Sequence, residues 1–309
     1  MKFLDVKTDF AFKKVFGSQD SKAILINFLN ALVEFSDARM ITDLVIVDPY
    51  SIPLLKGMKD SFVDVKAMLN DNSQVIIEMQ VLNHEGLEKR ILYNAAKNYS
   101  VQLNQGDPYR LLNPVIALTI TDFVLFNDTP ELISHFKLLE KNRLVEYSDD
   151  IELIFIELPK FSKIEPELQT TQDRWLYFIK NAGSLDYIPK DFNPEIQQAF
   201  GIANEANLSA EELEIQHKKR DFILIQKSAL ELAGKQGLQQ GLQQGLQQGL
   251  QQGLQQGLQQ GLQQGLQQGE RSAKEQMVLN AHHIGLPPAT ICELTGLDEQ
   301  QVNAVLQKE

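Results

Sequence analysis

Eight unbroken copies of the tetrapeptide GLQQ, from Gly237 to Gln268, separate two stretches of mixed composition. The repeat carries no charge, no aromatic residue and no proline, and this composition is typical of a low-complexity connector. The sequence therefore predicts three parts in the 309-residue chain: a core domain with a helical extension over residues 1–235, a connector over 236–269 and a small helical module over 270–309.

The sequence leaves the conformation of the repeat open. On a helix, a four-residue period advances about 400°, so the leucines form a stripe that drifts by about 40° per repeat. Leucine and glutamine favour a helix, whereas each glycine costs about 1 kcal/mol relative to alanine. Two interpretations follow: a flexible or fraying connector, or a helix that is stabilised by pairing of leucine stripes between two chains.

The composition excludes several classes of protein. The chain has 29 Lys and Arg against 41 Asp and Glu, a net charge of −12, which counts against nucleic-acid binding over the whole surface but leaves room for a basic groove. A single cysteine, Cys292, excludes a disulfide framework and a cysteine-based zinc site. No apolar run reaches the roughly 18 residues of a membrane helix, and the first residues do not resemble a signal peptide. We therefore expect a cytoplasmic protein with no membrane partner.

The hydrophobic pattern of the first 235 residues alternates between helical and extended segments. We expect helices over residues 8–16, 20–34 and 85–103, and mostly helix over 166–232. The expected strands are Ile41–Asp48, Ser61–Leu69, Gln74–Leu82, Val115–Thr121 and Ile151–Leu158. This order predicts an α/β domain in which helices cover a mixed sheet.

Two of these strands form a hairpin, because the turn-forming residues 70–73 separate them. Side chains alternate between the two faces of a strand, and here one face is wholly apolar: Val63, Val65, Ala67 and Leu69 with Val75, Ile77, Met79 and Val81. The segregation fixes a register in which residue numbers that sum to 142 face each other. That register places Asp64 opposite Glu78 on the second face.

Opposed like charges on neighbouring strands are destabilising, so something must neutralise Asp64 and Glu78. A hard divalent cation would do so, because carboxylates are the ligands that Mg²⁺ and Mn²⁺ prefer. The alternative is a solvated face on which Lys66 offsets the carboxylates. The spacing alone does not decide between these two interpretations.

Four segments together resemble a known family: TDFAFKKVFG, DSFVDVKA, VIIEMQ and RILYNAAKNY, which lie in this order within the first hundred residues. Their order is similar to that of the recombination-promoting nuclease/transposase family, a branch of the PD-(D/E)XK nucleases. The resemblance extends over roughly residues 5–270. It implies a PD-(D/E)XK restriction-endonuclease-like core, a mixed sheet flanked by helices, with a metal site on the hairpin.

The resemblance assigns roles to residues of the hairpin. Asp64 takes the position of the first metal-binding acid and Glu78 that of the second. Gln80 stands where the superfamily has a catalytic lysine, and glutamine carries no positive charge, although it can hydrogen-bond a water molecule. Lys66, two residues after Asp64, is our candidate for the missing cation.

Other candidates lie on the flanking helices. Asp9 is a candidate third carboxylate at the metal, although an acid at this place also stabilises a helix N-terminus. Lys13, Lys14 and Arg90 are candidates for contacts with nucleic-acid phosphates, and a solvated helix face is the alternative for the two lysines. Tyr93 and Tyr99, which follow Arg90, would line the same groove or pack in the core.

The resemblance thus implies a metal-dependent DNA endonuclease that uses Mg²⁺ or Mn²⁺ to hydrolyse phosphodiester bonds in recombination or mobile-element activity. The alternative is a catalytically silent protein on the nuclease fold that binds nucleic acid or oligomerises. The terminal module, residues 270–309, has a helix-turn-helix-like pattern in which Asp298 could cap the second helix, but its net charge is −3. We therefore expect the repeat or this module to serve self-association into a homo-oligomer rather than DNA reading.

Overall fold

A mixed sheet of six strands forms the centre of the first part of the chain in the computed structural model. Its strand order is β1-β4-β5-β6-β8-β7, in which β5, β6 and β8 run parallel and the other neighbours antiparallel. The strands are β1 (Leu44–Val47), β4 (Val65–Leu69), β5 (Gln74–Gln80), β6 (Val115–Thr121), β7 (Ile133–Leu139) and β8 (Glu146–Glu157). A separate pair joins β2 (Tyr50–Ser51) to β3 (Ser61–Phe62).

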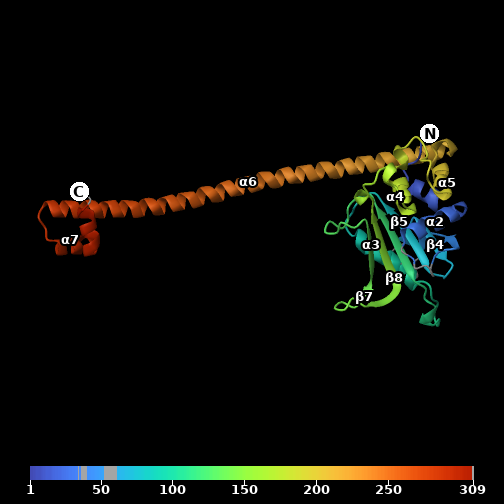
Figure 1. Cartoon of the computed structure of the whole chain (residues 1–309), viewed down its shortest axis with the longest axis horizontal. Coiled ribbons are helices and arrows are strands. Elements are labelled where there is room, and N and C mark those ends of the chain that lie inside the picture. The colour runs from blue at the N-terminus through green and yellow to red at the C-terminus, as the bar shows by residue number, and fades with distance from the viewer. Residues whose placement is uncertain (34, 36–39, 52–60, 308–309) are drawn as a thin grey trace. The chain divides into compact units, whose positions relative to one another are not determined.

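Helices cover both faces of this sheet (Figure 1). One face packs against α1 (Asp9–Phe16), α2 (Lys22–Leu32), α4 (Thr171–Asn181) and α5 (Pro194–Ala203). The other face packs against α3 (Leu87–Ser100), which connects the parallel strands β5 and β6. This arrangement is the α/β architecture that the sequence predicts.

The structure describes residues 1–33, 35, 40–51 and 61–307. Residue 34, the last of the predicted helix 20–34, and residues 308–309 of the predicted terminal module therefore lie outside the described residues. The chain divides into two compact units, Met1–Ala229 and Leu230–Glu309.

The predicted register of the hairpin is confirmed from Val65 to Met68. Asp64, which was expected opposite Glu78, precedes β4 and donates its backbone N–H to the carbonyl of Ile77 instead. The partners Val65 and Ile77, and likewise Ala67 and Val75, have residue numbers that sum to 142. The prediction for Val63 is wrong, because this side chain packs with the α3 cluster rather than with Val65. The cause is a bend at Asp64, which breaks the strict alternation of faces between β3 and β4.

Of the expected strand ranges, only Val115–Thr121 agrees with the structure at both ends, and the largest departures concern β8 and β7. Strand β8 begins at Glu146, five positions before the predicted start at Ile151, because it continues as the partner of β7. Strand β7 is absent from the sequence-based prediction. Its side chains are intermediate or exposed, and its pairing with β8 is irregular between Phe136 and Leu139, so it gives little of the alternation that marks a half-buried strand.

The repeat is helical throughout. It lies within α6 (Ala210–His283), a helix of 74 residues that also contains both predicted boundaries, at 235/236 and 269/270. All eight repeat leucines are between 61% and 77% exposed. The leucine stripe therefore has no partner within the described part of this chain, and pairing with a second chain stays a prediction.

The end of α6 packs with two short helices in the second unit, α7 (Pro288–Thr295) and α8 (Glu299–Leu306). Their common core contains Val278, Ala281, Ile291 and Val302. The Asp298 side chain accepts a hydrogen bond from the backbone N–H of Gln301 and so caps α8. Across the described residues, no helix is both long and apolar enough to cross a membrane.

Alanine in place of the repeat glycines should strengthen α6. A Cβ atom added at Gly245, Gly249 or Gly253 meets no atom within 4 Å, so the change should stabilise the helix by up to about 1 kcal/mol per site. Circular dichroism at 222 nm should then show a higher melting temperature for the triple variant. As a control, Gly183→Ala should lower the stability of the first unit, because its Cβ would lie 2.9 Å from the Cα of Asp5. Unchanged melting of the triple variant would contradict a helical repeat.

Candidate functional site

Asp64 lies at the bend between β3 and β4, and its carboxylate reaches across to β5. One oxygen accepts a hydrogen bond of 2.8 Å from the backbone N–H of Met79. The other oxygen lies 3.2 Å from the Nζ of Lys13 on α1. The Asp64 side chain is only 13% exposed, and the bend places its carboxylate beside the segment of β5 that carries Glu78.

Glu78 lies in the middle of the sheet, because β5 pairs with β4 on one side and β6 on the other. Its carboxylate is buried and accepts three side-chain hydrogen bonds: from Asn94 (2.6 Å), Arg90 (3.1 Å) and Gln80 (3.1 Å). Asn94 and Arg90 are one turn apart on α3, so they present their donors to the same carboxylate. The three donors fix both oxygens of Glu78.

Both carboxylates are desolvated. Burial raises the pKa of Asp64, against the lowering effects of the Met79 N–H and of Lys13, and the charge of Asp9 raises it further. Burial also raises the pKa of Glu78, which the Asn94 hydrogen bond and Arg90 lower and the charge of Asp64 raises. Desolvation and like charge are the causes expected for two acids that share one site.

These two side chains fit a magnesium or manganese site. Mg²⁺ is usually held by one or two carboxylates together with water, and the negative charges of Asp64 and Glu78 affect one another. Among the described residues, no group of three His, Cys, Asp or Glu side chains could hold a metal ion, so these residue types add no third side-chain ligand to the pair. The acidic side chains available to a metal ion here are therefore the two carboxylates of Asp64 and Glu78.

The charged residues of α1 point to different partners. Asp9 forms an ion pair of 3.1 Å with Lys219 of α6, and its charge still reaches Asp64. Lys14 forms an ion pair of 2.6 Å with Glu212 of α6. Of the three α1 candidates, the structure thus brings only Lys13 into contact with the carboxylate pair.

Lys66 lies away from the carboxylates. It pairs in the sheet with Val47 and Ile76, and it forms no ion pair with Asp64 or Glu78 within the described residues. Burial lowers the pKa of Lys66, and the charge that opposes this effect is that of Asp48. The proposed role of Lys66 as the cation beside Asp64 therefore has no support from this geometry.

The two tyrosines of α3 differ in their surroundings. Tyr99 packs against the α3 core cluster and interacts with Asp150 of β8, while burial raises its pKa. Tyr93 is 36% exposed. The interpretation of Tyr99 as a packing residue, which the sequence left open, agrees with this placement.

Some residues that position the carboxylates cannot be identified from sequence patterns. Asn94, inside the RILYNAAKNY segment, donates the shortest hydrogen bond to Glu78, and its place one turn after Arg90 is the signal that could have identified it. The Nε atom of Arg90 is buried and has no hydrogen-bond partner within the described residues. This N–H is available to an acceptor that enters beside Glu78.

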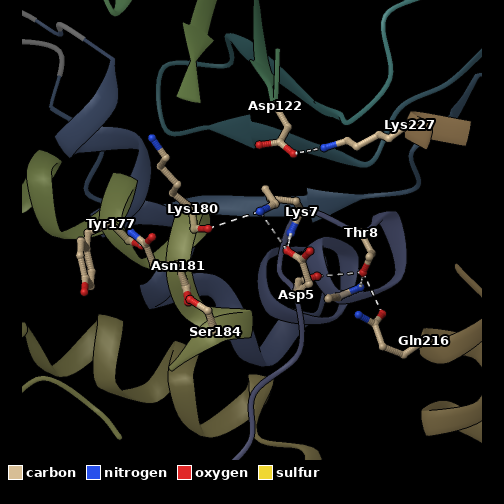
Figure 2. Close-up of polar contacts among 11 residues, drawn as sticks. Asp5, Lys7, Thr8, Asp122, Tyr177, Lys180, Asn181, Ser184, Gln216 and Lys227 are labelled. Atoms are coloured by element: carbon tan, nitrogen blue, oxygen red, sulfur yellow. Dashed lines mark hydrogen bonds and ion pairs between the residues drawn. The ribbon is translucent and has the colours of Figure 1, made fainter. Parts of the chain in front are cut away.

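Polar contacts join α6 to the residue that follows β6 and to the start of α1 (Figure 2). Asp122 follows β6, donates its backbone N–H to the carbonyl of Gln80 and forms an ion pair of 2.6 Å with Lys227. Thr8, the N-cap of α1, donates its hydroxyl to Gln216 at 2.8 Å. These contacts join residues about a hundred to two hundred positions apart, so no local pattern in the sequence could indicate them.

The comparison with known protein families agrees with this geometry. A family model described as PD-(D/E)XK nuclease family transposase matches residues 6–233, well over half of the chain. The match begins just before α1 and includes the whole sheet, so the resemblance stated from the four sequence segments is confirmed over residues 6–233, whereas its expected extension to about residue 270 is not matched. No curated protein and no solved structure matches the chain.

The raised pKa of Asp64 predicts a specific dependence of stability on pH. In the folded protein this carboxyl binds its proton more tightly than in the unfolded chain, so the free energy of unfolding falls as pH rises from about 3.8 through the raised pKa. Asp64→Asn removes this penalty. Its stability relative to the wild type should therefore increase between pH 4 and pH 8, as measured by urea denaturation at each pH.

Asp43→Asn is the matched control with the opposite sign. Asp43 is exposed, and its ion pair with Lys22 lowers its pKa, so its favourable contribution is present at neutral pH and is lost as pH falls. The Asp43→Asn variant should therefore be at its greatest disadvantage at neutral pH. If Asp64→Asn followed the same course as this control, burial would not be the dominant effect at Asp64.

Proposed function

The chain belongs to the PD-(D/E)XK nuclease family transposases, and from this premise we propose that it is a divalent-metal-dependent DNA endonuclease with its centre at Asp64 and Glu78. The observation that carries the proposal is the buried carboxylate pair, in which a cation faces each acid: Lys13 at Asp64 and Arg90 at Glu78. Burying two acids costs free energy, and a purely structural site would not need both.

The reaction we propose is hydrolysis of a phosphodiester bond. A bound Mg²⁺ or Mn²⁺ supplies polarisation of a phosphoryl oxygen and a lower pKa for a water molecule. Asp64 and Glu78 would hold that ion, while Gln80 and Asn94 keep the Glu78 carboxylate in one orientation. The water oxygen forms a bond to phosphorus, one P–O ester bond breaks, and one proton ends on the leaving oxygen while the other passes to solvent.

The alternative function is a catalytically silent protein that keeps the nuclease fold and binds nucleic acid or oligomerises. Three features favour the nuclease. Both acids are present, both are largely shielded from solvent, and the Nε of Arg90 is a buried donor without a partner in the described residues. A role in DNA recombination or mobile-element activity, which we also propose, rests on the family alone.

Cleavage of supercoiled plasmid tests this function directly. The purified protein should nick or linearise the plasmid with Mg²⁺ or Mn²⁺ and should be inactive in EDTA. Because metal coordination supplies several kcal/mol of transition-state stabilisation, Asp64→Ala and Glu78→Ala should each lower the rate by about 10² or more.

Asp43→Asn serves as the activity control, because Asp43 is an exposed acid that pairs with Lys22 rather than with the site. It should retain cleavage within about twofold of the wild type, as expected for a surface substitution. A folded wild-type protein that cuts no DNA with either metal would support the silent alternative. Equal activity in all four proteins would indicate a contaminating nuclease and would contradict the site.

We also propose that the chain forms a homo-oligomer through the leucines of α6 or through the terminal module. The eight repeat leucines are all exposed, and the segment before them carries exposed apolar residues at spacings of seven, three and seven: Ile215, Phe222, Ile225 and Leu232. Such spacing is typical of the seam between two paired helices.

Sedimentation velocity can locate the association. In the full-length chain, replacing the leucines of four central repeats (Leu246, Leu250, Leu254 and Leu258) with glutamine should shift the protein toward monomer. Leu294→Gln changes an exposed leucine of the terminal module instead, and a shift in this variant alone would assign the contact to that module. A wild-type chain that is monomeric at micromolar concentration would rule out both versions of the proposal.

A further inference from the structure

The position of Gln80 raises the question of which cation serves the site. The resemblance places a lysine at this position in the superfamily, whereas Gln80 is uncharged and donates its amide to Glu78. Phosphodiester hydrolysis accumulates negative charge on the phosphoryl oxygens, and a positively charged donor aimed at that charge is a large contributor to catalysis. If the proposed function holds, another side chain of the fold can supply this donor in addition to the metal ion.

Three of the four candidate cations are less suited to this role. Lys14 pairs with Glu212. The negative charge that acts on Lys66 is that of Asp48, not that of Asp64 or Glu78. Arg90 touches the site, but its guanidinium is fixed against Glu78, and its Nε is buried.

Lys13 differs from these three in its position and its freedom. Its Nζ lies 3.2 Å from Asp64, yet its side chain is 45% exposed while that of Asp64 is 13% exposed. The Lys13 side chain thus contacts a largely shielded carboxylate and is itself open to solvent, so a phosphate that approaches from solvent could reach it. A partly exposed lysine on a flexible four-carbon stem can turn from the carboxylate to an incoming phosphate oxygen.

The backbone that carries Lys13 is held firmly. The side chain of Thr8 caps α1, and the helix buries Ala11, Phe12, Val15 and Phe16 in the main core. Phe16 also packs against Phe28 and Trp175, with ring centroids 4.5 Å and 5.7 Å apart. The stem of Lys13 thus starts from a fixed point, which is what an oriented electrostatic contact needs.

We propose that Lys13 is the catalytic cation of this protein: it replaces the lysine missing at Gln80 and contacts the phosphate during hydrolysis from α1 instead of from β5. This proposal rests on the nuclease function proposed above. It assigns to Arg90 a positioning role at Glu78 and gives Lys66 no part in the reaction.

Lys13→Met is the central test, because methionine keeps the apolar stem and removes the charge. In plasmid cleavage it should lower the rate by about 10² to 10³, the range found when one transition-state donor is removed. Lys13→Arg should recover part of the activity. Lys14→Met and Lys66→Met are the matched controls and should stay within about threefold of the wild type, while circular dichroism confirms that all variants fold.

Two further measurements separate catalysis from other roles. Binding of a fluorescent DNA duplex in Ca²⁺ should weaken much less in Lys13→Met than cleavage does. The Mn²⁺ concentration that gives half-maximal cleavage should be nearly the same for Lys13→Met as for the wild type. If excess Mn²⁺ restored the activity of Lys13→Met, the lysine would only orient Asp64 for the metal, and the proposed contact with phosphate would be wrong.

The remaining outcomes are also decisive. An active Lys13→Met combined with an inactive Lys66→Met would overturn the assignment and return the role to Lys66. An active wild type with all three lysine variants active would leave the nuclease function intact and refute the role of Lys13. A wild-type protein that cleaves no DNA would refute both proposals, which distinguishes the failure of the function from the failure of this residue.

Discussion

The site depends on the cost of shielding two carboxylates from solvent, that of Glu78 within the sheet and that of Asp64 at the bend beside it. Glu78 cannot move away from the interior, because β5 is hydrogen-bonded to β4 and to β6. Asp64 is tied to β5 through the Met79 N–H. An ionised acid is tolerated in such a place only when donors and cations surround it. The neighbouring helices supply them: Lys13 from α1, and Arg90 and Asn94 from α3.

Helices α1 and α3 each contribute apolar residues to the core and polar residues to the site. This explains the composition of the two helical segments that resemble the family. In α1, Phe12 and Phe16 enter the main core while Lys13 reaches the site. In α3, Ile91 and Ala95 enter the second core cluster while Arg90 and Asn94 reach Glu78. A side chain can be aimed accurately only when its helix is fixed, so the hydrophobic residues of these segments are as necessary to the site as the polar ones.

Features that depend on residues close together in the sequence could be predicted, whereas features that depend on distant residues could not. The register of the hairpin and the strand Val115–Thr121 could be predicted, because alternation and apolar runs are local patterns. The bend at Asp64 could not be predicted, because the residues around it keep the alternation of apolar and polar side chains that is typical of a continuous strand. Nearness in sequence favours Lys66 over Lys13 as the cation beside Asp64. Lys13 is 51 positions away and meets Asp64 only because α1 packs beside the sheet.

Charge balance gives a physical reason for glutamine at position 80. Asp9 is offset by Lys219, so the centre itself contains the two acids Asp64 and Glu78 with the two cations Lys13 and Arg90. A lysine at position 80, beside Glu78, would add a third cation to a buried site and would compete with Arg90 for the same oxygen. It would also oppose the binding of a divalent metal ion. Glutamine keeps the hydrogen bond to Glu78 without the charge, so under the nuclease function proposed above the positive group at the phosphate would come from another element of the fold.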